Sequence, residues 1–424
     1  MKNKYVMSLV ISLALSIFFF GCKDGGTSMP ASSSGSLDTS FGDGGKVTTA
    51  IGTMFDAIRD TAIQTDGSIV AVGSSPTGTF TGVFAIARYK SDGSLDTTFN
   101  TTGKVTTAIG LINDIANAVA IQSDGKIVVV GGSAYQPGNY IFGLARYNTD
   151  GSLDTSFGTG GMVTTAIGNA SFAYDVVIQT DGKIVVAGAS DSGFALARYN
   201  TDGILDTSFG TGGIATTAIG TSSMAFYISI QADGKIVAAG KSSTGATTSV
   251  LVLARYNTNG GPDASFGTGG IMTVSNGTSY IDNAVAFQKD DKIVTAGFSA
   301  PGGFGLARYN TDGSLDASFG SGGIAITKGI YGMANSVAIQ PDGKIVAAGY
   351  SFIGSTIVFT LVRCDTNGSL DTSFNSTGIV TTQIGTVNDS ANTVAIRPDG
   401  IIVVAGSSRT GDTTGVFAVA QYLP

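Results

Sequence analysis

Carboxylates are the groups in this chain that could carry acid–base or metal chemistry, because its 424 residues include no His and two Cys. Paired Asp or Glu side chains could serve a glycosidase or a lyase. However, many Asp residues stand in phrases that recur seven times, and seven equivalent copies cannot all be one catalytic acid. Since we find no polar cluster that breaks the repeat, the sequence predicts a protein that is not an enzyme.

One recurring turn superficially resembles a calcium-binding loop. In the copy at residues 200–206, oxygen-bearing side chains alternate and a Gly follows Asp202. Arg198 would occupy the first ligand position, and no Glu closes the site as a calcium loop requires. We therefore expect turn chemistry there, with no metal and no cofactor.

Charged residues of opposite sign flank this turn and are expected to pair. A guanidinium and a carboxylate can form two parallel hydrogen bonds, which suits a partly buried joint in each repeat. In the last repeat Gln421 takes the Arg slot and Arg397 takes the Gln slot, so we infer that the two slots share one hydrogen-bond network. The expected structural pairs comprise Arg88, Arg146, Arg198, Arg255, Arg308 and Arg363 with Asp38, Asp96, Asp154, Asp206, Asp263, Asp316 and Asp371.

Aromatic residues depart from the repeat and are the better place to seek a binding site. We expect them in the loops that join the second strand to the third and the fourth strand to the next first strand, on one face. Aromatic rings on such a face can stack on sugars or receive a peptide, although packing between repeats is the alternative. The predicted ligand-face residues are Phe55, Tyr135, Phe172, Tyr174, Phe226, Tyr227, Tyr280, Tyr331 and Phe352.

Two phrases recur in step and predict the elements that position these residues. The phrase Q-x-D-G-x-I-V-x-x-G contains a hairpin signal, and L-D-T-S-F-G precedes it with copies 52–58 residues apart. Each repeat reads as four short strands, the second and third of which are continuous apolar runs, as in strands buried on both faces. The sequence predicts an all-β, seven-bladed β-propeller of four-stranded antiparallel blades. A β-solenoid is the alternative, but its parallel strands lack D-G hairpins.

The order of the two phrases predicts how the ring closes. The chain begins with the end of a repeat, at residues 35–52, and its last repeat has three strands, at residues 392–397, 401–406 and 416–422. We expect residues 35–52 to supply the outer strand of the last blade, which would remove an open sheet edge. Residues 35–424 would then form a single propeller domain.

The N-terminus has the pattern of an export signal. Lys2 and Lys4 precede an apolar stretch at residues 5–20, which is short for a membrane span. The F-F-G-C sequence ending at Cys22 resembles a bacterial lipobox. We therefore predict a lipoprotein-type signal peptide at residues 1–21, lipidation of Cys22 and a flexible tether at residues 22–34; ordinary secretion is the alternative. Lys23 after the Cys favours the outer membrane or cell surface, by resemblance to known sorting rules.

The repeat also resembles that of the bacterial delta-60 family, approximately V-A-I-Q-x-D-G-K-I-V-x-A-G followed by F-A-L-A-R-Y-N-x-D-G-S-L-D-x-S-F-G. The match covers nearly all of residues 36–422. The resemblance implies a β-propeller with repeat logic similar to that of NHL propellers. The family is defined by its repeat and not by a shared reaction, so the resemblance implies little about function.

The expected function follows from the composition of the chain and from its repeat pattern. With a formal charge of -7 the chain is a poor partner for nucleic acid. We expect a monomeric, non-catalytic envelope lipoprotein that meets the membrane only through its lipid anchor and binds an envelope protein or glycan through its loop face. The alternative is a structural or assembly lipoprotein without a small-molecule ligand.

Overall fold

Strands form the regular secondary structure of the described residues. The computed structural model describes residues 33–424 except 79–80, 137, 244–248, 275–279, 301 and 412–413. Residues 33–424 form one compact unit. The predicted signal peptide, Cys22 and most of the tether lie outside the described residues. In the described part of the chain, no helix is long and apolar enough to cross a membrane.

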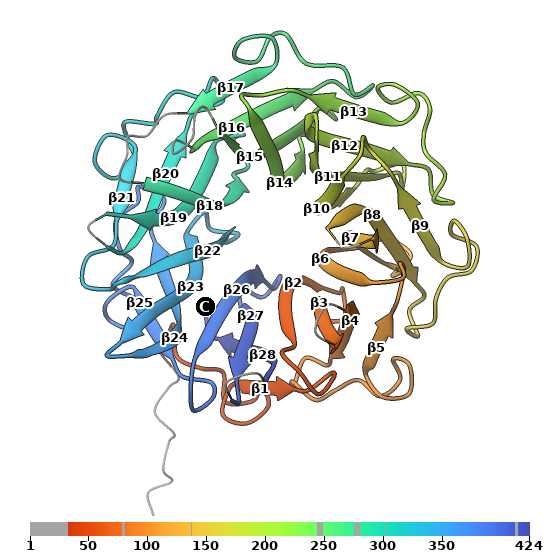
Figure 1. Ribbon diagram of the computed structural model, residues 1–424. Coiled ribbons are helices and arrows are strands. Elements are labelled where there is room, and N and C mark those ends of the chain that lie inside the picture. Colours follow the sequence, from red (N-terminus) through yellow and green to blue (C-terminus); the bar gives the residue numbers. More distant parts are fainter. Residues whose placement is uncertain are drawn as a thin grey trace, which may run out of the picture. The chain divides into compact units, whose positions relative to one another are not determined.

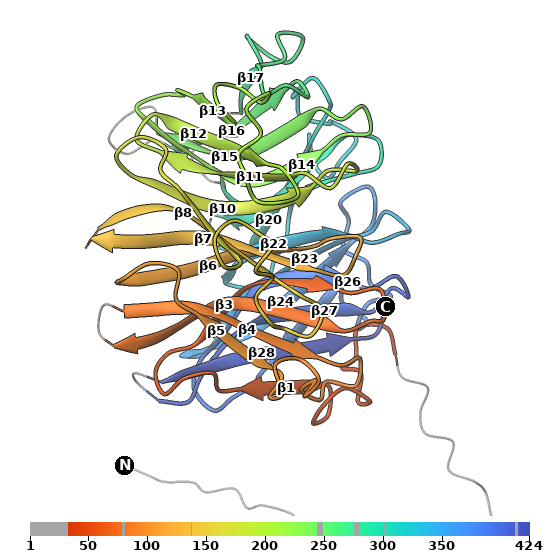
Figure 2. The same ribbon diagram turned by 90° about the vertical axis from the view of Figure 1, so that its right-hand side faces the viewer.

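The strands form small antiparallel sheets that stand radially around a common centre (Figure 1), and Figure 2 shows the same sheets from the side. The innermost strands are β2 (Ala57–Ile63), β6 (Asn113–Ile121), β10 (Ser171–Ile178), β14 (Ser222–Ile230), β18 (Tyr280–Phe287), β22 (Gly332–Ile339) and β26 (Asp389–Ile396). The second strands are β3 (Ile69–Gly78), β7 (Ile127–Gln136), β11 (Ile184–Ser190), β15 (Ile236–Ser243), β19 (Ile293–Ser299), β23 (Ile345–Ile353) and β27 (Ile402–Arg409). The third strands are β4 (Thr81–Tyr89), β8 (Asn139–Tyr147), β12 (Gly193–Tyr199), β16 (Ser249–Tyr256), β20 (Phe304–Tyr309), β24 (Thr356–Cys364) and β28 (Gly415–Tyr422). The outer strands are β5 (Lys104–Thr107), β9 (Met162–Thr165), β13 (Ile214–Thr217), β17 (Ile271–Val274), β21 (Ile324–Ile326), β25 (Ile379–Thr382) and β1 (Lys46–Thr49).

The sheets are not all separate. Five have four strands, whereas β2 to β9 form one eight-stranded sheet. A single parallel bridge between Gly82 of β4 and Asn113 of β6 joins its two halves. The bridge depends on the missing side chain, because a Cβ on Gly82 would lie 2.6 Å from Asn113 Oδ1. The sequence predicted independent four-stranded sheets and missed this bridge.

The second and third strands carry the core, as their continuous apolar runs predict. Val128, Val129 and Val130 of β7 are all fully buried, so successive residues pack on opposite faces of the same sheet. One cluster joins Val185 and Ala187 of β11 to Ala238 of β15. Full burial of such a side chain contributes about 1.5–3 kcal/mol. Packing between neighbouring sheets therefore holds the sheets in place around the centre.

The two ends of the described chain lie in one sheet, with strand order β1-β28-β27-β26. Lys46 to Thr49 pair antiparallel with Ala420 to Phe417. Before β1, the Asp38 amide donates to the Gln421 carbonyl at 2.9 Å. Phe41 is fully buried in a cluster with Val403 and Val419. The amino-terminal segment therefore contributes both backbone pairing and core packing to this sheet.

Glycines occupy the left-handed positions of the D-G hairpin turns. Gly125 and Gly182 have φ of 82°, a conformation that favours residues without a side chain. One copy of the turn has Asp291 at this position, with φ of 61°. The turn geometry is thus kept at some cost in strain, about 1 kcal/mol.

Candidate functional site: the central cavity

Every innermost strand carries a β-bulge. In β2 the pairing with β3 shifts register between Ile58 and Asp60, so Arg59 is left out of the ladder. The opposing residue is Gly73, where a Cβ would overlap the carbonyl oxygen of Ala57. Gly73 is therefore a position of close backbone approach opposite the bulge. The bulge turns the extra residue toward the common centre of the sheets.

The residues at the bulges differ among the repeats. In each repeat the bulged residue lies five positions before the Gln slot that follows the innermost strand, as Arg59 lies before Gln64. The next residue, Asp60 in this repeat, lies four positions before that slot. Four repeats have Asn at the bulge, while three have Arg59, Tyr174 and Phe226. The next position holds Asp60, Asp175 and Tyr227 in those three repeats. The repeat is therefore broken on β2, β10 and β14, at the positions that face the centre.

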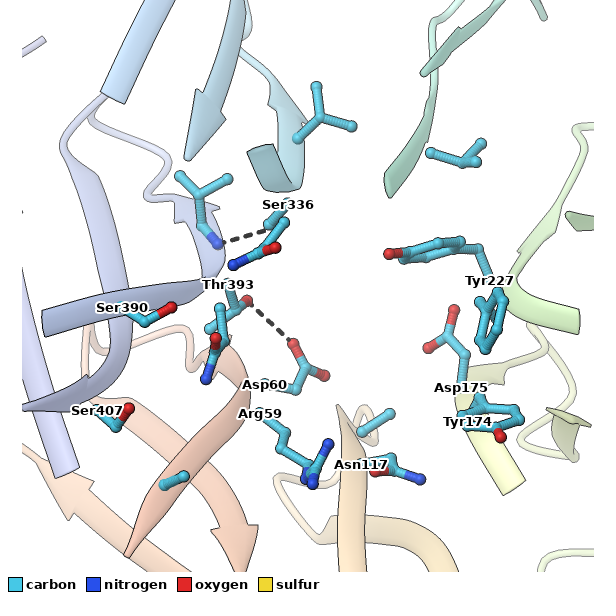
Figure 3. Close-up of a pocket in the computed structure, with 18 of the residues that line it drawn as sticks. Arg59, Asp60, Asn117, Tyr174, Asp175, Tyr227, Ser336, Ser390, Thr393 and Ser407 are labelled. Atoms are coloured by element: carbon cyan, nitrogen blue, oxygen red, sulfur yellow. Dashed lines mark hydrogen bonds between the residues drawn. The ribbon is translucent and has the colours of Figure 1, made fainter. Parts of the chain in front are cut away.

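These side chains line a cavity of about 640 Å³ at the centre of the sheets. Arg59, Asp60, Tyr174, Asp175 and Tyr227 all contribute to its wall. Figure 3 shows Asp60 and Asp175 facing each other across the cavity, with Tyr174 and Tyr227 beside Asp175. Sequence reasoning missed this polar cluster because its members are far apart along the chain. Alignment of the seven repeats on the Gln slot would have found it.

Asp60 is held by three neighbouring strands. Its carboxylate accepts hydrogen bonds from the Thr61 amide at 2.8 Å and the Val119 amide of β6 at 3.0 Å. Thr393 Oγ1 of β26 is 3.3 Å away. Burial raises the pKa of Asp60 to about 6, although these hydrogen bonds act to lower it. The carboxyl can therefore change its protonation state near neutral pH.

Asp175 is the matching group on the other wall. Its carboxylate accepts hydrogen bonds from the Val176 amide and from the Ile228 amide of β14, both at 2.8 Å. Burial, and then the charge of Asp60, raise the pKa of Asp175 to about 7. Asp60 therefore ionises at a lower pH than Asp175. At neutral pH such a pair can hold one proton, so that one member can accept a proton and the other can donate one.

Arg59 supplies a positive charge to the wall of the same cavity. Within the described part of the chain, its guanidinium forms no hydrogen bond and no ion pair, although it interacts electrostatically with Tyr174. Burial lowers the pKa of Arg59 and raises that of Tyr174, while the Arg59 charge acts to lower the Tyr174 pKa. A guanidinium with free donors inside a cavity is suited to an anionic group such as a carboxylate.

Other bulge residues tie the sheets together. Asn117 Nδ2 donates to the Ala173 carbonyl at 2.6 Å, and Asn392 Nδ2 donates to the Ile58 carbonyl at 2.7 Å. Asn335 Nδ2 donates to the Ala391 carbonyl at 2.8 Å. Among the described residues, no group of three or more Cys, Asp or Glu gathers as a metal site would require.

The predicted ligand-face residues divide into separate groups. Phe55, Tyr174, Phe226 and Tyr227 line the central cavity. Phe172 contacts Tyr174, with ring centroids 5.2 Å apart. These residues were expected in loops, which is wrong for four of them: Phe172, Tyr174, Phe226 and Tyr227 lie within β10 and β14, because those strands start earlier than the sequence indicated.

The remaining predicted aromatics lie elsewhere. Tyr331 and Phe352 form a second cluster, with ring centroids 5.8 Å apart, and both are exposed. Tyr135 is 42% exposed. None of these three lines the central cavity. The side chain of Tyr280 lies outside the described residues. The loop prediction is also wrong for Tyr135 on β7, for Phe352 on β23 and for Tyr280, which begins β18.

The predicted Arg and Asp residues meet at one joint per repeat. Their closest nitrogen–oxygen distances are 2.7–2.8 Å, in the pairs Arg88–Asp96, Arg146–Asp154, Arg198–Asp206, Arg255–Asp263, Arg308–Asp316 and Arg363–Asp371. Each guanidinium also lies over a Phe ring, for example Arg198 over Phe209 at 4.6 Å from the ring centroid. These joints stabilise the sheets and lie outside the central cavity.

The seventh joint uses the exchanged residues. With its amide oriented to satisfy both neighbours, Gln421 donates to Asp38 Oδ2 at 3.3 Å and accepts from Arg397 Nη1 at 3.2 Å. The structure thus places the Arg slot and the Gln slot in contact. The same proximity occurs elsewhere, since Arg146 Nη1 lies 3.5 Å from Gln122 Oε1. The N-terminal segment contributes Asp38 to this network.

The change Arg198→Met should lower the free energy of unfolding by about 3 kcal/mol, because it leaves the buried Asp206 carboxylate without its guanidinium. Arg198 Nε lies 2.8 Å from Asp206 Oδ2. Lys183 Nζ lies 2.9 Å from the same oxygen, so in the variant it still compensates part of the Asp206 charge. Urea denaturation measures the loss. The matched control is Asp181→Asn, since the Asp181 side chain is 55% exposed and its removal should cost less than about 0.5 kcal/mol. Equal effects of the two changes would contradict a buried joint.

Comparisons with known proteins agree with this architecture. Six segments match the family model described as "Domain of unknown function (DUF5122) beta-propeller", at residues 64–99, 122–157, 179–209, 231–266, 288–319 and 340–374. The chain carries β-propeller repeats. No curated protein matches it. The matched segments support the predicted repeat family at the level of a β-propeller.

Solved structures show the same fold at low sequence identity. A protein of unknown function from Dyadobacter fermentans has a TM-score of 0.51 and 10% identity, over 89% of this chain and 98% of that chain. A catalytically inactive virginiamycin B lyase from Staphylococcus aureus, with quinupristin, has a TM-score of 0.50 and 10% identity, over 88% and 98%. The polysaccharide lyase Uly1 has a TM-score of 0.50 and 11% identity, over 86% and 90%.

These similarities correct the prediction that the protein is not an enzyme. Two of the similar propellers are lyases, so a repeated β-propeller of this kind is compatible with catalysis. The prediction rested on the absence of a polar cluster that breaks the repeat. Arg59, Asp60 and Asp175 form such a cluster in the cavity. The sequence argument failed because it judged the Asp residues by the repeated phrases and not by the positions that face the centre.

Proposed function

We propose that the described strands form a seven-bladed propeller in which β1 completes the last blade and closes the ring. The pairing of β1 with β28 and the halves of the eight-stranded sheet support this count. Residues 1–21 would direct export, and Cys22 would carry a lipid that anchors the propeller by the tether at 22–34 to the outer membrane or cell surface. The propeller would then act on envelope or surface material.

The central cavity is proposed to bind an acidic glycan and to cleave it. The observation that carries this proposal is the break in the repeat that places Arg59, Asp60 and Asp175 in one cavity. The Arg59 guanidinium, which forms no hydrogen bond or ion pair in the described part of the chain, would bind the carboxylate of an acidic sugar. Tyr174 and Phe226 would contact the apolar face of the sugar ring. The two lyases among the similar propellers are consistent with the proposal.

The reaction that fits these groups is β-elimination. Binding of the sugar carboxylate by Arg59 makes the hydrogen on the adjacent carbon more acidic. Asp60, whose pKa is the lower of the pair, accepts this proton as its C–H bond breaks. The electron pair forms a carbon–carbon double bond as the glycosidic C–O bond breaks, and the leaving oxygen takes a proton from Asp175. The products are a new chain end and an unsaturated sugar, with no water consumed.

A product assay tests this function. Purified full-length protein is incubated with acidic polysaccharides, such as polygalacturonate, alginate and hyaluronate, and with a neutral glucan. We expect an increase in ultraviolet absorption from the new double bond with an acidic polymer and none with the neutral one. New reducing ends without that absorption would indicate hydrolysis instead. If none of these acidic polymers binds or is cleaved, the proposed function is wrong.

One observation favours a second candidate. Asp60 and Asp175 each accept an amide hydrogen bond from the next innermost strand, so the pair also connects neighbouring sheets. A structural or assembly lipoprotein would need only that connection. Under this candidate, Asp→Asn changes in the cavity would alter stability and leave no glycan-dependent activity to lose.

A further inference from the structure

A line of aromatic rings leads from the edge of the sheets into the central cavity. Tyr140 of β8 contacts Phe172, with ring centroids 5.0 Å apart. Phe172 contacts Tyr174 at 5.2 Å, and Tyr174 contacts Phe226 at 4.8 Å. The four rings thus connect β8, β10 and β14 in one continuous series, which we call the aromatic track. Its inner end, Tyr174 and Phe226, belongs to the cavity wall.

The track borders a second hollow. Tyr140 and Phe172 line a hollow of about 310 Å³ together with Ser223 and Asp191. Tyr140 also lines a third hollow of about 640 Å³, between β4 and β6. Gly132 makes room for the track, since a Cβ there would overlap the ring of Phe172. The rings therefore mark a path that passes from one hollow to the next and ends at the cavity that Asp60 and Asp175 line.

Polar groups along this path have the character of a sugar-binding surface. Ser223 Oγ lines the 310 Å³ hollow and has no hydrogen-bond partner among the described residues, although Ser223 is only 2% exposed. A buried hydroxyl without a partner is costly unless a ligand or water satisfies it. Aromatic faces next to a hydroxyl group suit sugar rings, which have both apolar faces and hydroxyl edges.

We infer that the aromatic track binds the sugar units of a polymeric acidic glycan that flank the unit cleaved in the cavity. This inference rests on the proposed function and names its substrate as a chain rather than a free sugar. The chain would lie across β8, β10 and β14 and would present one acidic unit to Arg59. Because the track continues beyond the cavity, longer chains would gain contacts that short ones lack.

The length dependence of binding tests the inference. Affinities for a galacturonate dimer and octamer are measured with full-length wild-type protein and with Tyr140→Ala, Phe172→Ala and Tyr331→Ala, and cleavage rates are measured in parallel. Tyr140→Ala and Phe172→Ala should each weaken octamer binding about threefold to tenfold and leave dimer binding unchanged. Tyr331→Ala is the matched control, because Tyr331 is an exposed ring of the separate cluster with Phe352 and should change neither.

The outcomes separate the track from the cavity. Two results would overturn the track and leave the proposed function intact. The first is that wild-type protein cleaves both oligomers and binds dimer and octamer with equal affinity. The second is that the track variants lose equal affinity for dimer and octamer. Failure of the wild-type protein to bind or cleave any acidic oligomer would overturn both. Selective binding of an unmodified peptide along the track would overturn the glycan assignment. If Phe172→Ala does not fold, the octamer affinities of Tyr140→Ala and Met224→Ala take its place in the test. Met224 is partly exposed, and its thioether lies 3.6 Å from the Tyr174 hydroxyl.

Discussion

Removing residues 35–52 should lower the free energy of unfolding by more than about 5 kcal/mol. The deletion removes the β1–β28 ladder and the fully buried Phe41, whose loss alone is worth about 3–5 kcal/mol. It also removes Asp38 from the network with Gln421 and Arg397. The exposed edge of β28 would then be available for pairing with other molecules, so aggregation should accompany the loss. Thermal unfolding and light scattering measure the two effects.

Two matched variants sharpen this test. Deletion of residues 23–32 shortens only the predicted tether and should leave the melting temperature unchanged. Phe41→Ala keeps the strand but removes its core contact, so it should give an intermediate loss. A truncated protein that melts like the full-length chain would show that the ring does not depend on its amino-terminal strand.

The changes Asp175→Asn and Arg59→Met should each lower the cleavage rate by about a hundredfold or more. Asp175→Asn removes the proton donor but keeps an oxygen to accept from the Ile228 amide, which is 2.8 Å from the native carboxylate. Loss of general acid–base catalysis typically costs 10²–10⁴-fold. Arg59→Met removes the anchor for the sugar carboxylate and should also weaken binding. The matched control Asp233→Asn alters an exposed turn carboxylate and should retain full activity.

The pH dependence of cleavage checks the assignment of the two carboxyls. Activity should rise as Asp60 loses its proton through its pKa of about 6 and fall as Asp175 loses its proton through its pKa of about 7. A bell-shaped profile with a maximum between these values is therefore expected. Asp175→Asn should remove the bell shape of any remaining activity. A profile that stays flat from pH 5 to pH 8 in the wild-type protein would exclude the pair as the catalytic acid and base.

The same carboxyls give a stability signal of known sign. Their pKa values are higher in the folded protein than in the unfolded chain. The contribution of the two protonated carboxyls to the free energy of unfolding is therefore complete at low pH and is lost as pH rises through about 6 to 7. Asp175→Asn removes the cost of ionising this buried group. The variant should therefore be more stable, relative to wild type, at pH 8 than at pH 5. A catalytic loss with this stability gain would separate a chemical role from a purely structural one.

Much of the architecture could be predicted because the local structure of each repeat depends on residues that are close together in the sequence. The D-G turns, the continuous apolar runs of β7 and β8 and the glycines opposite each bulge follow from neighbouring residues alone. The pairing of Arg198 with Asp206 was also accessible, since one turn separates them. The parallel bridge from Gly82 to Asn113 was not accessible, because it joins two repeats through a close backbone approach.

The central site was harder to predict for a related reason. Arg59 and Asp60 belong to one repeat, Tyr174 and Asp175 to another, and no short motif contains them all. An alignment of the repeats shows that these residues differ in type from those at the same positions of the other repeats. Their common location depends on the bulge that turns each position inward and on the circular order of the sheets.

The sequence by itself determined the repeated strand pattern, the β-propeller class and the charged joints, because these arise from contacts within a repeat or between neighbours. Only the tertiary structure decided which departures from the repeat act together. It placed Asp60 close enough to Asp175 to raise the pKa of Asp175, and it placed Arg59 in the same cavity. The physical reason is that a radial arrangement of the sheets brings the same position of each repeat to one centre, where residues distant in the chain share a single cavity.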